Sequence, residues 1–210
     1  MTWLEKAAEL DHPTALFECG KELWSSEQEQ ERKDKAISFL RSAGEKGNYQ
    51  AVFHLAAALR EREGTQSKEA FQLALKAAEG GIEEAWVVVG DSYLKGEGTD
   101  KRLVSSLQWY RKAAGKGDHS AMIRLGEVIL DHDGLSIGGQ SRDELLEEAE
   151  KWLRLASDPP EAEALYQLSR CLRRVDYIGV NIIEGVEKLK AAAELGQVTA
   201  QNTLGVCLIV

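Results

Sequence analysis

The chain has 210 residues, of which 43% are hydrophobic and 29% charged, and its formal net charge is −9 at pH 7. This composition excludes a disordered chain, and no apolar run approaches the roughly 20 residues that span a bilayer. The negative net charge opposes a phosphate backbone, which argues against nucleic acid as a partner.

Pairs of alanines that lie eight residues apart recur along the chain, and each second alanine is followed five residues later by a small residue. The first alanines are 36, 34, 36, 43 and 36 residues apart. A period in this range predicts stacked helical hairpins, because a single hairpin cannot bury its apolar face alone. The six pairs are Ala7/Ala15, Ala43/Ala51, Ala77/Ala85, Ala113/Ala121, Ala156/Ala164 and Ala192/Ala200.

The first alanine of each pair ends one helix (helix B), and the second opens the next (helix A), with glycines in most of the connections. This pattern predicts an all-α solenoid of about twelve helices. The expected helices span residues 2–10, 13–25, 29–45, 48–62, 66–80, 82–96, 101–116, 118–131, 142–157, 160–174, 182–195 and 197–209.

We expect one solenoid over residues 1–210. It comprises a half-repeat at 1–12, units that begin near 13, 48, 82, 118 and 160, and a half-repeat at 197–210. The connection from helix A to helix B varies in length and is longest between Asp131 and Asp143, where several glycines predict an irregular loop.

The segment 85–117 contains Ala85, Gly90, Tyr93, Gly96, Gly98, Asp100, Trp109, Lys112, Ala113 and Ala114. With these residues it resembles the Sel-1-like repeat, a relative of the tetratricopeptide repeat. The resemblance implies a right-handed superhelix of antiparallel helix pairs, with helix A on the concave face and helix B on the convex face. It also implies a non-enzymatic scaffold or adaptor for other proteins. An alternative that it allows is an inhibitor or immunity protein that masks a bacterial effector.

Ser92 and Lys95 form an SxxK motif, in which a lysine one helical turn away can help to remove the serine proton. This motif raises a further alternative, a penicillin-recognising enzyme. The partner motifs SDN and KTG do not occur, and Ser92 falls within the ordinary repeat pattern, so we predict no enzyme and no catalytic residue.

We also predict no cofactor and no metal. The Gly96–Gly98 turn follows a helix, whereas a dinucleotide fingerprint needs a preceding strand. Asp131, His132 and Asp133 are consecutive on a helix end, so their side chains point in different directions. The three cysteines, Cys19, Cys171 and Cys207, suit buried thiols better than a disulfide framework.

Function is therefore sought on the concave face, where a protein or peptide segment would bind. By analogy with tetratricopeptide geometry, positions two, six and nine residues after the second alanine face inward. They predict a groove that is acidic around the third and fourth units and basic near Arg170 and Arg173. The partner-binding residues expected there are Phe17, Trp24, Phe53, Arg60, Val87, Asp91, Ile123, Glu127, Tyr166, Arg170 and Arg173.

The chain as given has no signal peptide, which predicts a cytoplasmic protein, or a secreted or periplasmic one if a leader has been trimmed. Repeat arrays normally close with a polar face, but Val206–Val210 is almost wholly apolar and Trp3 opens a half unit. These ends predict either truncation from a longer array or self-association through an end.

Overall fold

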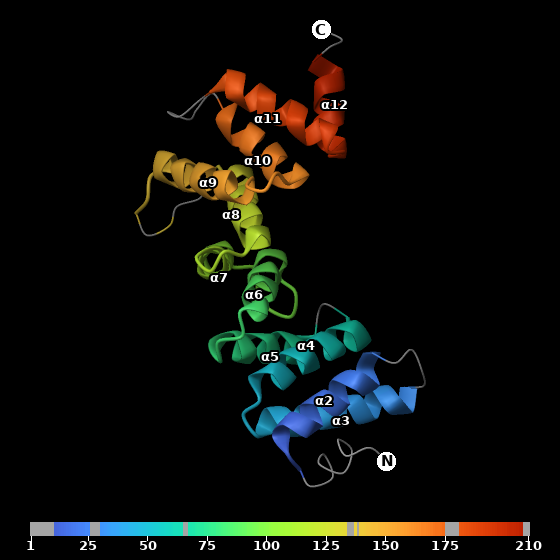
Figure 1. The fold of residues 1–210 in the computed structure, drawn as a ribbon. Helices are drawn as coiled ribbons and strands as arrows, with labels where there is room; N and C mark the ends of the chain where they lie inside the picture. The colour runs from blue at the N-terminus through green and yellow to red at the C-terminus, as the bar shows by residue number, and fades with distance from the viewer. Residues whose placement is uncertain are drawn as a thin grey trace. The chain divides into compact units, whose positions relative to one another are not determined.

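The computed structural model describes residues 11–25, 30–64, 67–133, 137, 139–174 and 181–207. Within these residues the chain forms eleven α-helices and no β-strand (Figure 1). The chain divides into two compact units, Met1–Trp109 and Tyr110–Val210. The boundary between them lies within helix α7, Leu103–Ala114.

Each unit is a run of helices in which consecutive helices pack against each other. The first unit contains α2 (Pro13–Ser25), α3 (Gln30–Glu45), α4 (Tyr49–Glu63), α5 (Lys68–Glu79) and α6 (Glu84–Lys95). The second unit contains α8 (His119–Asp131), α9 (Arg142–Ala156), α10 (Ala162–Leu172), α11 (Ile182–Glu194) and α12 (Val198–Cys207).

The predicted all-α repeat fold is confirmed. Each helix expected after residue 12 is present, and its described ends lie within two residues of the prediction. The helix expected at 2–10 lies outside the described residues, and so do parts of the irregular loop between Asp131 and Asp143. The extension of one solenoid over the whole chain stays a prediction.

One turn geometry ends helix B at four junctions. In each, the backbone N–H of the residue five positions after the first alanine donates to the carbonyl of that alanine over 3.0–3.2 Å. The glycine just before the donor has a φ between 86° and 91°, a left-handed conformation that favours glycine. This arrangement is a Schellman motif, which satisfies carbonyls that the helix end leaves without partners. The donor and acceptor pairs are Asn48 and Ala43, Ile82 and Ala77, Asp118 and Ala113, and Gln197 and Ala192.

At three of these junctions, the residue that closes helix B also caps helix A. The side-chain oxygens of Asn48, Asp118 and Gln197 accept hydrogen bonds of 3.0, 2.8 and 2.6 Å from the N–H of the second alanine, three residues later. Five residues from the first alanine to the cap and three more to the second alanine make the eight-residue interval. The recurring spacing therefore follows from two hydrogen bonds that share one residue.

The alanines of the pairs are buried in the core. All eleven that the structure describes expose 5% of their surface or less. The large apolar residue four positions after the second alanine is buried at five of the six sites, including Leu55, Val89 and Leu125. Cys19 occupies this position in α2 and is a buried free thiol, in agreement with its predicted packing role.

The small residue that comes directly after this large apolar residue lets helix B of the same repeat pack closely against helix A. A Cβ added at Gly20 would lie 2.8 Å from Cγ of Leu40, and one at Gly126 would lie 2.6 Å from Cγ of Leu153. At Gly205, by contrast, an added Cβ meets nothing within 4 Å. The same repeat position therefore imposes a steric limit only where a helix covers it.

We expect Asp118→Ala to lower the free energy of unfolding by about 1 kcal/mol, because α8 loses the acceptor for the Ala121 N–H. Asp118→Asn retains a side-chain oxygen and should cost about half of that or less. Urea unfolding followed by circular dichroism measures both changes. Equal loss in the two variants would contradict a capping role.

Gly126→Ala should lower the free energy of unfolding by about 1–3 kcal/mol, because the new methyl group overlaps Leu153, which is fully buried. Gly205→Ala is the matched control, since it adds the same group at the same repeat position in open space. It should be neutral or stabilise by up to about 1 kcal/mol, because alanine favours helix over glycine. Chemical denaturation of the two variants checks this difference, which a purely local propensity effect would not produce.

Candidate functional site

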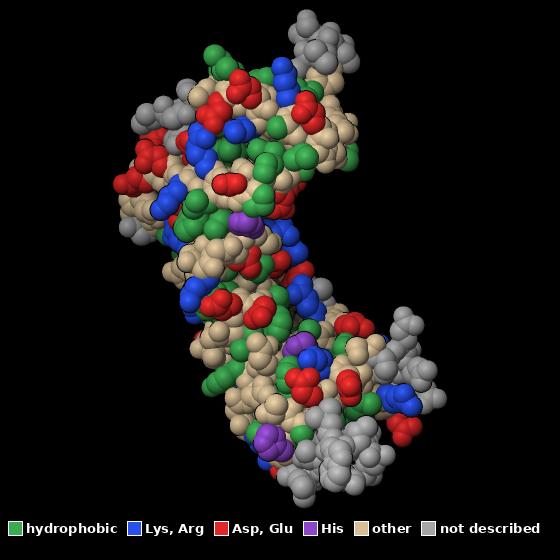
Figure 2. Space-filling model, viewed as in Figure 1, with side chains coloured by type: hydrophobic (Ala, Val, Ile, Leu, Met, Phe, Trp, Pro, Cys, Tyr) green, Lys and Arg blue, Asp and Glu red, His purple; other side chains and the backbone are tan. Residues whose placement is uncertain are grey.

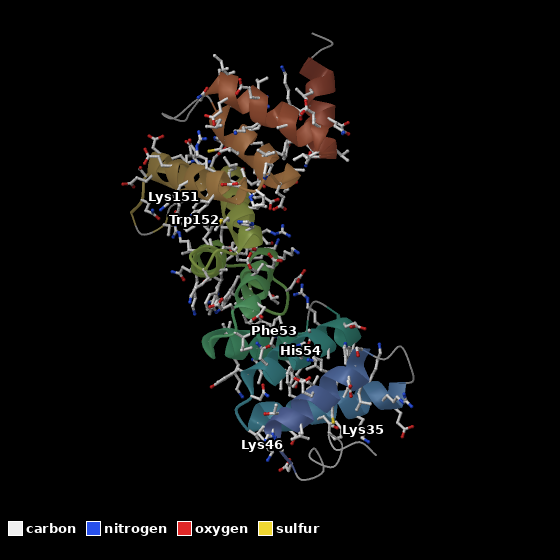
Figure 3. All side chains as sticks on the ribbon, viewed as in Figure 1. Lys35, Lys46, Phe53, His54, Lys151 and Trp152 are labelled. Carbon is white, nitrogen blue, oxygen red and sulfur yellow. The ribbon has the colours of Figure 1, made fainter. Side chains whose placement is uncertain are left out.

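An apolar pocket of about 360 Å³ lies between α4, α5 and α6 in the first unit. Its walls are mostly small and aromatic side chains, and Phe53 of α4 is labelled in Figure 3. Two of the predicted partner-binding residues, Phe53 and Arg60, line it. The other lining residues are Ala56, Ala57, Glu61, Ser67, Ala70, Phe71, Ala74, Val88, Ser92 and Glu97.

The pocket has room because Ala57 is small. Ala57 lies six residues after the second alanine, a position held by Lys21, Asp91, Glu127, Arg170 and Val206 in the other repeats. A long side chain at this position would extend over the space beside Phe53. The signal for the pocket is therefore in the sequence, as the one alanine at a position that has a larger side chain in every other repeat.

The polar rim of the pocket is an ion pair between Arg60 and Glu97. The Arg60 side chain is 31% exposed and that of Glu97 only 14%, so the pair is partly shielded from solvent. Glu97 is held there by the turn after α6, where Gly98 has a φ of 68°. A Cβ on Gly98 would lie 2.5 Å from the carbonyl oxygen of Ser67, so only glycine permits this approach.

Residues expected on the same face of α2 pack beside the pocket wall instead of lining it. The Phe17 ring lies 5.3 Å from that of His54, which in turn meets Phe53 edge-on at 6.0 Å. Figure 3 labels His54 and Phe53 on α4. Trp24 packs against the core of this unit, and the ammonium of Lys33 lies 5.1 Å from its ring centroid. Phe17 and Trp24 therefore support the site rather than lining it.

The half-buried His54 ring has a lowered pKa, because burial disfavours its charged form and Lys21 adds a smaller repulsive effect. The neutral ring thus suits its place between two phenylalanines.

On α6 the lining residues are one position later than expected. Val87 and Asp91 were predicted, but Val88 and Ser92 line the pocket. One residue is a rotation of about 100° on a helix, so the flank of α6 that faces α4 and α5 differs from the predicted ridge. Phe71 was not predicted, because it belongs to helix B, where the prediction placed no site. Its ring meets Tyr93 edge-on at 5.2 Å.

The Ser92 hydroxyl is engaged with the backbone. Ser92 is 4% exposed, and its Oγ donates to the carbonyl oxygen of Val88 over 2.9 Å, while Lys95 is exposed. The single hydroxyl proton is therefore directed at a carbonyl one turn earlier, and this geometry offers no activated nucleophile.

In the second unit, three predicted residues line one pocket of about 320 Å³: Tyr166, Arg170 and Arg173. Leu130, Arg174 and Thr203 complete its walls, and we call it the arginine pocket. Arg170 donates to Asp131 over 2.6 Å and to Gln167 over 2.7 Å. Thr203 was not predicted, because it lies one residue after Asn202, the position of α12 that was expected to face inward.

The remaining two predicted residues, Ile123 and Glu127 of α8, lie elsewhere in the second unit. They line a more polar pocket of about 520 Å³ with Ser120, Arg124, Glu161 and Glu163. Glu127 pairs with Arg124 over 3.3 Å, and Ile123 is only 7% exposed. Ile123 therefore contributes to packing, whereas Glu127 lies at a polar rim.

Asp131, His132 and Asp133 do not converge on a common point. Asp131 binds Arg170, Asp133 binds Arg142 and Arg174, and His132 Nδ1 lies 2.9 Å from the Val128 carbonyl oxygen. Among the residues that the structure describes, no group of three or more His, Cys, Asp or Glu is placed to hold a metal ion. Nor does any described helix combine the length and apolar character needed to cross a membrane.

Comparison with known proteins agrees with these repeats. The model of the Sel1 repeat matches residues 1–12, 14–48, 53–82, 88–118 and 119–158. The chain belongs to the Sel1 repeat family. Proteins of this family are typically non-enzymatic scaffolds for protein interactions.

Two solved Sel1-type structures share the fold at 24% sequence identity. One is c5321, a protective antigen of uropathogenic Escherichia coli, with a TM-score of 0.77 over 94% of this chain. The other is a Sel1 repeat protein from Oxalobacter formigenes, with a TM-score of 0.75 over 92% of this chain. The alignments cover 41% and 78% of those two chains, respectively.

A curated relative is the chitin synthase regulator SKT5 of Saccharomyces cerevisiae. It is 42% identical over 57 residues, which are 27% of this chain and 8% of the yeast protein. The Sel1 chain thus spans less than a tenth of that relative.

We expect acidification from pH 7.5 to 5.5 to lower stability partly through His54. Its pKa is lower in the folded than in the unfolded chain, so the unfolded chain binds more protons below about pH 6.5. His54→Gln should therefore lose less melting temperature over this pH range than the parent chain. His119→Gln, at an exposed histidine, is the control and should behave like the parent. An equal pH response in all three proteins would contradict this account.

Proposed function

We propose that this Sel1 chain is a non-enzymatic scaffold that binds a segment of another protein, with the apolar pocket of the first unit as its anchor site. The observation that supports this most directly is the pocket itself, formed where Ala57 stands in place of the larger side chains of the other repeats. Its volume of about 360 Å³ suits one large apolar side chain of a peptide.

The Arg60–Glu97 ion pair at the rim supplies hydrogen-bond donors and acceptors for the backbone of a bound peptide. A bound segment presents N–H and C=O groups that require partners once water is excluded. Arg60 has five N–H donors, and Glu97 accepts, so the ion pair can bind backbone groups beside the apolar anchor. A partner segment with one buried aliphatic or aromatic residue and exposed flanking backbone fits this arrangement.

The expectations from the sequence about self-association, cellular location and alternative functions remain proposals. Self-association through a chain end is supported by Val198 and Val206 on α12, each 66% exposed. The cytoplasmic location stays a prediction. An effector inhibitor is the alternative function, whereas a penicillin-recognising enzyme is disfavoured because the Ser92 hydroxyl donates to the Val88 carbonyl oxygen.

We expect Ala57→Gln to weaken peptide binding by about tenfold or more, because its side chain occupies the space that an anchor residue needs. Random twelve-residue peptides displayed on phage are selected on the parent protein, and an enriched peptide is synthesised with a fluorescent label. Fluorescence anisotropy then gives its dissociation constant for the parent and the variant.

Ser38→Gln, at an exposed position of α3 outside the pocket lining, is the matched control and should bind as the parent does. Both substitutions place glutamine on an exposed helix surface, so neither should alter the thermal midpoint by more than a few degrees. If no peptide is enriched, or if the enriched peptide binds Ala57→Gln as tightly as the parent, the proposed anchor site is wrong.

A further inference from the structure

The arginine pocket of the second unit differs from its surroundings in charge. On the face drawn in Figure 2, acidic and basic side chains are interspersed, and the chain as a whole is negative. At the ends of α8 and α10, however, three guanidinium groups pair with two carboxylates, those of Asp131 and Asp133, and a fourth guanidinium lines the pocket beside them. The four arginines are Arg142, Arg170, Arg173 and Arg174.

Two of these arginines have a structural role. Arg142 donates to the carbonyl oxygen of Ile129 over 2.7 Å, and Arg174 donates to that of Leu130 over 3.2 Å. Both also bind Oδ1 of Asp133, at 3.0 and 2.8 Å. They therefore satisfy carbonyls at the end of α8, where cations are favoured by the helix dipole.

Arg173 has no such role. In the described part of the chain it makes no ion pair and no hydrogen bond through its side chain. Its aliphatic stem packs on α11 at Gly185, where an added Cβ would lie 2.5 Å from Cγ of Arg173. The stem is thus held in place, and the guanidinium lines the pocket without an anion.

The rest of the wall offers further donors beside an apolar surface. The Tyr166 hydroxyl makes no hydrogen bond to the described residues, and it can donate one to a ligand. Arg170 uses two bonds, to Asp131 and Gln167, and has further N–H groups. Leu130, with a half-buried Tyr166 ring, gives the pocket an apolar side.

We infer that the arginine pocket binds an acidic side chain of a protein segment, with its carboxylate on Arg173 and Tyr166. This inference rests on the proposed scaffold function and specifies the chemistry of the partner at a second position. A peptide is favoured over nucleic acid because the arginines gather in one small pocket, whereas the chain as a whole has a net charge of −9, which opposes a phosphate backbone. Guanidinium and carboxylate match in geometry, and a phenol beside them adds a directed hydrogen bond.

The pocket uses the same repeat positions as the apolar pocket. Tyr166, Arg170 and Arg173 of α10 correspond to Phe53, Ala57 and Arg60 of α4. In the first unit Arg60 is paired with Glu97 of its own chain. In the second unit Arg173 lacks such a partner among the described residues, and we infer that the ligand supplies it.

The test uses a fluorescein-labelled twelve-residue peptide that alternates glutamate with serine, and the same peptide with glutamine in place of glutamate. Anisotropy titrations use the full chain at 50 mM NaCl. The glutamate peptide should bind at least about tenfold more tightly than the glutamine peptide, as expected when a charge-assisted hydrogen bond is lost. Raising the NaCl concentration to 300 mM should weaken binding of the glutamate peptide, because salt screens the attraction between charges.

Arg173→Gln should weaken binding of the glutamate peptide by about tenfold or more, whereas Arg173→Lys keeps the charge and should lose less. Lys190→Gln, which changes the net charge equally at an exposed position outside the pocket lining, should bind as the parent does. The aliphatic stem of Arg173 is similar in length to the side chains of glutamine and lysine, so either replacement can keep the packing on α11. Thermal melts monitor the folding of each variant.

Several results would overturn the inference. They are no binding of the glutamate peptide at 1 mM, equal binding of the glutamine peptide, or an equal affinity loss in Lys190→Gln and Arg173→Gln. Tighter binding of a twelve-nucleotide single-stranded DNA than of the glutamate peptide would assign the pocket to nucleic acid instead. Because Ala57→Gln and the phage-selected peptide report on the first unit, failure there with success here, or the reverse, separates the two proposals.

Discussion

The hydrogen bonds at the junction between helix B and helix A are the constraint on which the repeat depends. One residue donates its N–H to the last turn of the helix before it and, where its side chain permits, accepts from the first turn of the helix after it. A left-handed glycine just before that residue turns the chain, as Gly117 does at a φ of 91°. These bonds fix the phase of one helix relative to the next, and the burial of the alanines follows from that phase.

Because the phase is fixed, equivalent positions in different repeats occupy equivalent places on their helices. The two pockets illustrate this, because α4 and α10 use the same three positions to line them. Two of the three side chains differ: phenylalanine against tyrosine two residues after the second alanine, and alanine against arginine six residues after it. The fold thus provides a repeated site whose chemistry is set by few residues, without changes to the packing beneath.

The sequence predicted the helices closely because their ends are encoded locally, by alanine spacing, glycines and capping residues such as Asn48 and Asp118. It also placed Tyr166, Arg170 and Arg173 together, since they follow one helix face. It did not predict Phe71 or Glu97, because their places depend on how α5 and the turn after α6 pack against α4. The shift from Val87 to Val88 has the same origin, since the rotation of a helix about its axis is set by its neighbours.

The shared turn residue also links the energetics of neighbouring helices. When a helix pair in a solenoid opens, its neighbour loses a packing surface, and here it loses a backbone partner as well. At Asp118, fraying of α7 removes the acceptor of the Asp118 N–H, and fraying of α8 removes the Ala121 donor from its side chain. Cooperativity in such a chain therefore passes through single residues along the backbone, and a sequence change at one turn alters how far an opening spreads.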